Sequence, residues 1–373
     1  MGFDIARQYR KLFPVTENLV YLNHAAVAPL CKPAADAMKN LADDACHWGS
    51  YHYDQWMACY DGFRTAAAKL MNAEPGEIAI TKNTSEGIAT IQMGLDWKAG
   101  DKVVAFQEEF PANFFPWKRL EAKGVRVEWL SIYDSLEKID AAAKGARLLA
   151  ISFVNYLSGH RVDLAAIGEI CERHNCFYFV DAIQGLGVFP IDVRAMKIDA
   201  LAADGHKWLL GPEGCAVLYV RRGVQDQIEP VEFGWTNIAG YNDYACRDMA
   251  LRDDAGRYEP GTLNTIGCYG LRASMEFLLE VGVENAGASV MANAAMIAEG
   301  AQSLGYRLMI PRADMATASG IVSFQKDGVD SRLVVKKLRD AGITAAPRQG
   351  WVRVSPHFYN HDEDIAKLLA TLR

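Results

Sequence analysis

The chain has neither a long apolar run nor an excess of basic residues. No stretch approaches the length that a membrane-spanning helix needs, and residues 1–15 carry charge throughout, unlike a secretory signal peptide. Lysine and arginine number 39 against 46 aspartate and glutamate residues, which gives a net charge of −7. No basic stripe with interleaved aromatic residues is present to follow a phosphate backbone. We therefore expect neither a nucleic-acid partner nor a membrane partner.

Paired cysteines are also missing. The eight cysteines are scattered along the chain, and none forms a CxxC pair or a zinc-like cluster with histidine. Scattered single cysteines are typical of buried thiols in a reducing compartment. The sequence therefore predicts a cytoplasmic protein without a metal site.

The chain lacks a linker rich in glycine, serine or proline, and it lacks internal repeats. Instead, short apolar runs alternate with amphipathic stretches. The runs predict strands at 77–81, 102–106, 126–130, 147–154, 177–181, 200–203 and 215–220, and the amphipathic stretches predict helices such as 85–95, 113–122 and 165–174. Uniformly apolar strands separated by helices indicate an α/β fold with a mostly parallel sheet, covered on both faces.

The pattern changes at about Thr265. Long helical patterns cover residues 266–286 and 287–304, and three short strands with intervening helices are expected after them. We therefore predict two domains. Residues 1–264 comprise an N-terminal segment and a large α/β domain, and residues 265–373 form a small C-terminal α+β domain.

Polar residues follow several of the predicted strands, at the edge where an open parallel sheet binds ligands. Thr84 and Ser85 begin a helix, so their hydroxyls and free backbone N–H groups suit a phosphate, although they also suit a plain helix cap. Asp181 ends an apolar strand. Its carboxylate could bind a protonated pyridine nitrogen and make the ring an electron sink, or it could simply cap a turn.

Lys207 follows another apolar strand and precedes Trp208 and two leucines. Partial desolvation in this setting would lower the pKa of the lysine and free its neutral amine for Schiff-base formation. Most lysines, in contrast, lie at the surface with their charge in water. Asp181 and a segment suited to a phosphate precede Lys207, and these three features together make Lys207 a candidate site residue.

Seven motifs occur in one order along the chain: NHAA at 23–26, NTSEG at 83–87, ANxxPW at 112–117, DxxQ at 181–184, GHK at 205–207, EPGT at 259–262 and RVSPHFYN at 353–360. In this order they resemble the class V aminotransferase superfamily, the fold-type I enzymes of pyridoxal 5′-phosphate (PLP) that include cysteine desulfurases and isopenicillin N epimerase-like proteins. The resemblance spans about residues 21–360. It implies the PLP-dependent transferase fold of type I, with a mostly parallel seven-stranded sheet in the large domain.

The resemblance also implies a role for each matching residue. Lys207 corresponds to the catalytic Schiff-base lysine, and the other residues implied to bind the cofactor are Thr84, Ser85, Phe110, Asn155, Asp181, Gln184, His206 and Thr262. The residues implied to bind an amino-acid substrate are Asn23, His24, Asn155, Arg348 and Arg353; of these, Asn155 and Arg353 correspond to the groups that hold its α-carboxylate. The position of Thr262 corresponds to a residue that reaches the phosphate of a neighbouring subunit, which implies a homodimer with shared sites.

Two departures from the family pattern bear on the reaction. Phe110 stands where many desulfurases place a histidine over the cofactor, so it can stack but cannot exchange protons, and Lys207 becomes the expected base. The stretch from Arg348 to Arg353 contains no cysteine and has no room for the mobile loop that carries the desulfurase nucleophile. A persulfide-forming desulfurase is therefore not expected.

These features together favour a lyase. The substrate would form an external aldimine, Lys207 would remove its α-proton, and a cysteine-type substrate would lose its β-substituent. An aminotransferase and an isopenicillin N epimerase-like epimerase remain alternatives with the same first steps. A non-catalytic binding module is the alternative from another class. A nicotinamide-dependent dehydrogenase is excluded because no GxGxxG motif follows the first predicted strand.

Overall fold

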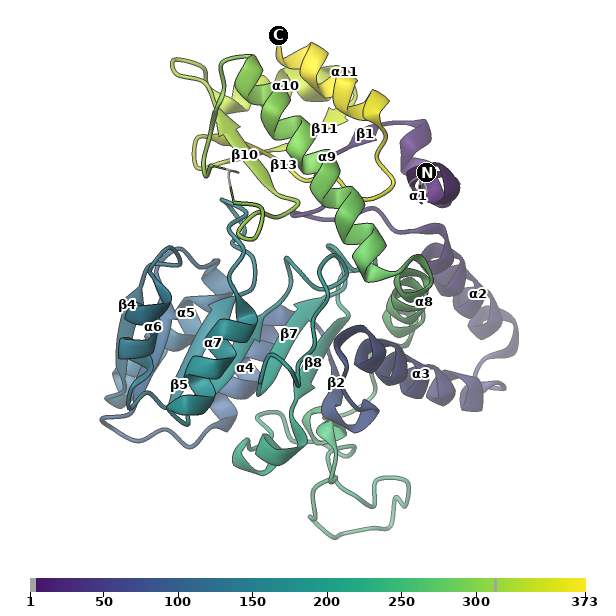
Figure 1. Ribbon diagram of the computed structural model, residues 1–373. Coiled ribbons are helices and arrows are strands. Elements are labelled where there is room, and N and C mark those ends of the chain that lie inside the picture. The colour runs from purple at the N-terminus through teal and green to yellow at the C-terminus, as the bar shows by residue number, and fades with distance from the viewer. Residues whose placement is uncertain (1–4, 312–313) are drawn as a thin grey trace.

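The computed structural model describes residues 5–311 and 314–373 (Figure 1). Its large sheet has seven strands in the order β2-β8-β7-β6-β5-β3-β4. Their bounds are β2 (Ile78–Thr81), β3 (Lys102–Phe106), β4 (Arg126–Leu130), β5 (Leu148–Ser152), β6 (Phe177–Asp181), β7 (Ala200–Asp204) and β8 (Ala216–Val220). Only β8 is antiparallel to its neighbours. The prediction of a mostly parallel seven-stranded sheet is confirmed.

Both faces of this sheet are covered, which explains why most of its strands are apolar; the edge strand β4, with Arg126 and Glu128, is only partly buried. Successive residues of a strand point to opposite faces, so Val104 belongs to one apolar core and Val103 to the other. The first face is covered by α3 (Tyr53–Met71), α6 (Leu136–Ala143), α7 (Leu164–Arg173) and α8 (Thr265–Val281). The second face is covered by α4 (Thr84–Gly94) and α5 (Phe115–Arg119).

A smaller antiparallel sheet lies above the large one in Figure 1. Its order is β12 (Ala346–Arg348), β13 (Trp351–Val354), β10 (Val322–Gln325) and β9 (Arg307–Leu308). The helices α9 (Val283–Ser303), α10 (Ser331–Asp340) and α11 (Asp362–Leu372) pack with it around a separate core. With β11 (Ile343–Thr344), five strands follow α9 where the sequence predicted three. Three of these five, β9, β11 and β12, are only two or three residues long, too short to stand out as apolar runs.

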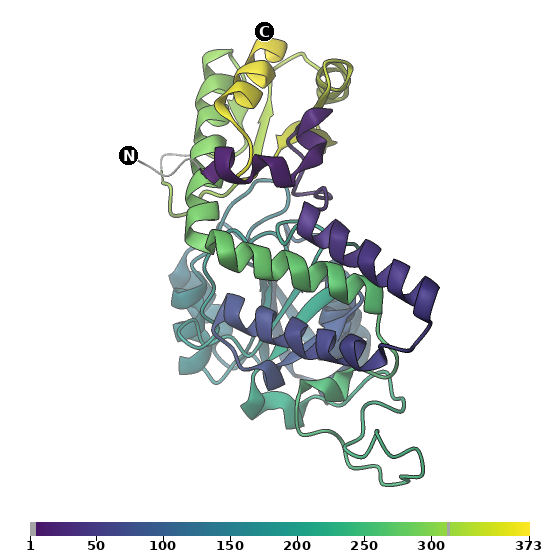
Figure 2. The same ribbon diagram turned by 90° about the vertical axis from the view of Figure 1, so that its right-hand side faces the viewer.

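The start of the chain packs against its end. The strand β1 (Val20–Tyr21) pairs in parallel with β11, and Phe13 stacks on Tyr359 at 3.8 Å between ring centroids. The helix α1 (Ile5–Tyr9) lies near α9, while α2 (Lys32–Trp48) packs with α3 along α8 (Figure 2). The domain boundary at residue 264 stays a prediction.

Among the helices of residues 5–311 and 314–373, none is both long and apolar enough to cross a bilayer.

Candidate active site

A cavity of about 300 Å³ lies beyond the carboxyl ends of β5, β6 and β7, at the edge predicted to bind ligands. The predicted site residues that line it are Thr84, Ser85, Phe110, Asp181, Gln184, His206, Lys207, Arg348 and Arg353. They come from both sheets and from segments far apart in the sequence. The fold therefore brings together most of the residues that the motifs singled out.

Lys207 reaches this cavity from the turn that follows β7. Burial lowers the pKa of its amine to about 8, with Asp181 opposing the shift and Arg353 adding to it. Its Nζ lies 5.8 Å from the centroid of the Phe110 ring. The next residue, Trp208, is buried and fixes the turn through its indole N–H. A substantial fraction of neutral amine is thus available near neutral pH, as Schiff-base chemistry requires.

Asp181 and Gln184 form the floor of the cavity. Burial raises the pKa of Asp181 to about 6, while a hydrogen bond from the Ile183 N–H to Oδ1 (3.0 Å) opposes that shift. The Gln184 amide donates from Nε2 to the Ala25 carbonyl (3.0 Å) and accepts from Trp208 Nε1 (2.8 Å). Asp181 is therefore an anion above about pH 6, and Gln184 is held in one orientation.

The opposite end of the cavity suits a phosphate. The helix α4 begins at Thr84, and the N–H groups of its first turn have no acceptor within the helix. The Thr84 hydroxyl accepts a hydrogen bond from the Asp204 N–H (3.0 Å), so its own proton remains to be donated. His206 Nδ1 lies 2.9 Å from Asp204 Oδ1, although neither atom forms a hydrogen bond among the described residues. N–H and O–H donors at a helix N-terminus favour an anionic group.

Arg353 and Arg348 line the other side of the cavity. Arg353 is 2% exposed; its Nη1 donates to the Tyr156 carbonyl (2.6 Å), and its Nε has no partner among the described residues. Burial, with a smaller contribution from the like charge of Arg348, lowers the pKa of Arg353 to about 10. Neither arginine forms a salt bridge with a carboxylate in the part of the chain that the structure describes. A buried guanidinium with free donors is suited to a substrate carboxylate.

Four predicted site residues do not line this cavity. The Asn155 Oδ1 accepts from the N–H groups of Leu157 (3.0 Å) and Ser158 (2.9 Å), and its Nδ2 donates to the Glu108 carbonyl. His24 is buried, with Nδ1 2.8 Å from the Ser355 carbonyl and Nε2 2.6 Å from the Tyr359 hydroxyl.

The other two are Asn23 and Thr262. Asn23 forms a backbone bridge with Ser355, and Thr262 lines a separate cavity together with Phe233 and Gly261. The functional roles of Asn23, His24, Asn155 and Thr262 stay predictions.

The sequence did not single out Tyr156 or Glu109. Tyr156 lines the cavity directly after Asn155, and nothing in the sequence distinguished it. The buried Glu109 carboxylate accepts from the N–H and the hydroxyl of Ser152, beneath the cavity. Burial raises the pKa of Glu109 to about 8, and the negative charge of Asp181 adds to the shift. Its place directly after β3 was a usable signal, because other site residues also follow strands.

The raised pKa of Glu109 predicts a pH-dependent stability. Between pH 4.5, its ordinary value, and about pH 8, unfolding releases a proton that the folded state holds. Stability should therefore fall as pH rises through this window and should fall no further above it. At about 1.4 kcal/mol per pKa unit, the effect is on the order of a few kcal/mol.

Urea unfolding of cofactor-free wild type and Glu109→Gln at the two ends of the window tests this expectation. The wild type should lose more stability than Glu109→Gln on going to the higher pH. The same loss in both proteins would contradict the assignment.

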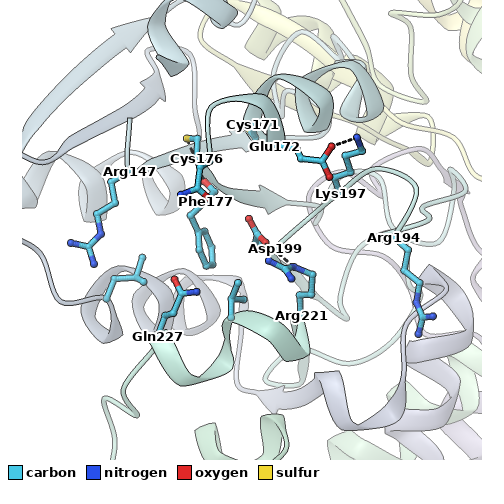
Figure 3. Close-up of a pocket in the computed structure, with 13 residues that line it drawn as sticks. Arg147, Cys171, Glu172, Cys176, Phe177, Arg194, Lys197, Asp199, Arg221 and Gln227 are labelled. Carbon is cyan, nitrogen blue, oxygen red and sulfur yellow. Dashed lines mark hydrogen bonds and ion pairs between the residues drawn. The ribbon is translucent and has the colours of Figure 1, made fainter. Parts of the chain in front are cut away.

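A larger cavity, of about 510 Å³, lies at the opposite edge of the sheet (Figure 3). It contains several cationic side chains, but each is paired. Arg147 bonds Asp101 (2.6 Å), Arg221 bonds Asp199 (2.7 Å), Arg194 bonds Glu74 (2.7 Å), and Lys197 pairs with Glu169 and Glu172. The two cysteines of this cavity, Cys171 and Cys176, are buried, and the hydrogen bond with Cys176 together with burial raises the pKa of the Cys171 thiol. The candidate active site is the cavity at Lys207, because that cavity holds most of the predicted site residues.

The stretch between Arg348 and Arg353 is a tight hairpin. Arg348 pairs with Trp351 across β12 and β13, and the turn consists of Gln349 and Gly350 alone. This confirms that there is no room for a mobile loop. Among the described residues that line the cavity, none is a cysteine.

Comparison with known proteins places this geometry in a family. The family model described as aminotransferase class-V matches residues 20–368. A probable cysteine desulfurase of Pyrococcus abyssi is 30% identical, over 99% of this chain and 97% of its own. The apo structure of a cysteine desulfurase from Thermococcus onnurineus is 26% identical, with a TM-score of 0.90, and the match covers 98% of this chain and 96% of that one. The cystine C–S lyase C-DES, at 24% identity and a TM-score of 0.89 over 96% and 98%, shares the fold.

The chain belongs to the class V aminotransferase family and is a PLP-dependent enzyme, as the motifs predicted. The donor set of the cavity fits PLP. Lys207 would hold the aldehyde carbon, Asp181 the pyridine nitrogen, and the start of α4 with His206 the phosphate. When bound, PLP supplies an electron sink for negative charge at the substrate Cα.

Proposed function

We propose that this enzyme is a C–S lyase, which removes the β-substituent of a cysteine-type amino acid by elimination. One observation carries the proposal: a lysine with a lowered pKa, a buried aspartate and a buried arginine share one cavity that has no cysteine in its lining. A desulfurase needs a thiol to accept the sulfur, whereas an elimination needs only α-proton removal and a leaving group.

The residues that line the cavity have separate roles in this proposal. Arg353 binds the α-carboxylate of the substrate through its free N–H groups, and Arg348 contributes positive charge at the mouth. The neutral amine of Lys207 takes the α-proton. Phe110 packs on the cofactor face without exchanging protons. The names of two similar proteins, a probable cysteine desulfurase and a cystine C–S lyase, support a sulfur-containing amino acid as the substrate.

The test is an incubation of the PLP-loaded enzyme with cysteine, cystine and S-substituted cysteines. We expect pyruvate and a thiol or sulfide product in equal amounts from at least one of them. A 2-oxo acid that retains its sulfur would identify an aminotransferase, and loss of optical activity without either product would identify an epimerase. Either result, or the absence of any reaction, would overturn the proposal.

We also propose a homodimer with shared sites. Phe233 and Trp235, which are 53% and 46% exposed, lie near the separate cavity of Thr262 and could be buried by a second copy. Sedimentation should give twice the monomer mass; a monomer at micromolar concentration would contradict the proposal. A cytoplasmic location is proposed because all eight cysteines are free, as expected in a reducing compartment.

A further inference from the structure

A hydrogen bond joins the β12–β13 hairpin to Tyr156, which lines the Lys207 cavity. Gln349 Nε2, in the β12–β13 turn, donates to the Tyr156 hydroxyl (2.9 Å), across 193 positions of sequence. Arg353, on the same hairpin, donates to the Tyr156 carbonyl (2.6 Å). One hairpin thus holds Tyr156 at both its backbone and its side chain.

The backbone conformation of the turn supports a functional role for the hydrogen bond between Gln349 and Tyr156. Gln349 has φ +47° and Gly350 φ +86°, the paired positive angles of a two-residue hairpin in which asparagine or aspartate before glycine is favoured. A glutamine in the left-handed region carries a conformational cost. Non-glycine residues held in this way cluster at functional sites, where surrounding contacts maintain them.

The Tyr156 hydroxyl has a proton to give. Since it accepts the hydrogen bond from Gln349, its O–H is free to donate, and no described protein atom accepts that hydrogen. Tyr156 lines the same cavity as Lys207 and Arg353. Its ring packs edge to face on Phe110, at 5.2 Å between centroids, and Lys207 Nζ lies 5.8 Å from the centroid of the same ring.

The other proton-bearing groups of the cavity already have roles. Lys207 is proposed to take the α-proton, and Asp181 would hold the pyridine nitrogen. His206 lies beside Asp204, on the side of the cavity that would hold the phosphate. Tyr156 is the remaining O–H group beside the arginine that binds the substrate carboxylate.

We propose that Tyr156 is the proton donor to the leaving sulfur and that Gln349 is its positioning residue; the inference rests on the proposed lyase function. The Cα–H bond breaks and its proton goes to the Lys207 amine. The electron pair left at Cα forms the Cα=Cβ bond, the Cβ–S bond breaks with its pair on sulfur, and the Tyr156 proton neutralises that sulfur. Tyr156 regains a proton from water. Hydrolysis of the enamine product gives pyruvate and ammonium. The overall reaction converts the substrate and one water into pyruvate, ammonium and the thiol, without an oxidant or a reductant.

The test compares two leaving groups in wild type and Tyr156→Phe. The alkyl thiolate of S-methylcysteine is strongly basic and needs a proton to leave, whereas the chloride of β-chloroalanine does not. For thiol release, kcat should fall by roughly 10²-fold in Tyr156→Phe, the range of general acid catalysis. Chloride release should stay within about threefold, because no proton is transferred in that step. An unchanged visible cofactor band confirms a folded site, and Tyr306→Phe, a hydroxyl loss in the small-domain core, is the matched control.

Each outcome supports or overturns the role proposed for Tyr156, for Gln349 or for the enzyme. Equal losses with both substrates, or no loss with either, would overturn the role of Tyr156. Failure of wild type with both substrates would instead overturn the proposed lyase function. Gln349→Ala, which keeps Tyr156, should show a smaller loss with the same dependence on the leaving group. An unaltered preference between leaving groups in that variant would remove the positioning role of Gln349.

Discussion

Replacement of Lys207 by alanine is expected to lower kcat by roughly 10⁴-fold or more, because this one amine holds the cofactor and takes the α-proton. The wild-type protein should show a visible Schiff-base absorption band, and the variant should lose it while keeping its fold. The structural reason is the setting of Lys207, in which burial lowers the pKa to about 8 and Asp181 lies close enough to oppose the shift.

Lys336→Ala is the control for this experiment, since Lys336 lies on α10 and pairs only with Asp340. It should retain both the absorption band and the activity. Persistence of the Schiff-base band in Lys207→Ala would show that another lysine holds the cofactor. Normal turnover by Lys207→Ala would remove it as the base.

The second large effect is expected at Arg353. Arg353→Ala should raise KM for the substrate by roughly 10²–10³-fold, because a carboxylate would lose a desolvated guanidinium partner worth about 2–5 kcal/mol. Arg348→Ala offers a matched comparison in the same cavity. Arg348 is exposed, so its loss should change KM by less than about fivefold.

The two arginine variants distinguish a carboxylate site at Arg353 from one at Arg348. A larger rise in KM for Arg348→Ala than for Arg353→Ala would place the carboxylate site at the mouth of the cavity. Arg353→Lys should restore only part of the affinity, because an ammonium cannot form the two parallel hydrogen bonds of a guanidinium. Full restoration would show that charge alone is needed.

Much of the large sheet could be predicted because its strands are buried on both faces. The bounds predicted for β3, β4 and β6 agree with the structure, although β4, with Arg126 and Glu128, is only partly buried. The two-residue strands β1, β9 and β11 could not be predicted. They exist only through pairing with distant segments, such as Val20 with Ile343, and carry no pattern of their own.

The active-site residues, like the strands, were predictable only in part. Lys207, Asp181 and Arg353 were found because motifs mark them, and the structure brings them into one cavity. Asn155 carried an equally strong motif signal, yet its side chain is occupied by the turn that follows β5. Tyr156 was missed because its setting depends on Gln349, which lies far along the chain in the β12–β13 turn. Motifs identify residue types, whereas the free donors of a site depend on contacts that only the fold creates.

The most direct test of the central claim is the product formed from cysteine by the PLP-loaded enzyme. Elimination gives pyruvate with sulfide, whereas desulfuration gives alanine and leaves the sulfur on a protein thiol. The account predicts pyruvate and sulfide in equal amounts with no alanine, since no described residue lining the cavity is a cysteine. Alanine as the main product, with sulfur bound to the protein, would contradict it.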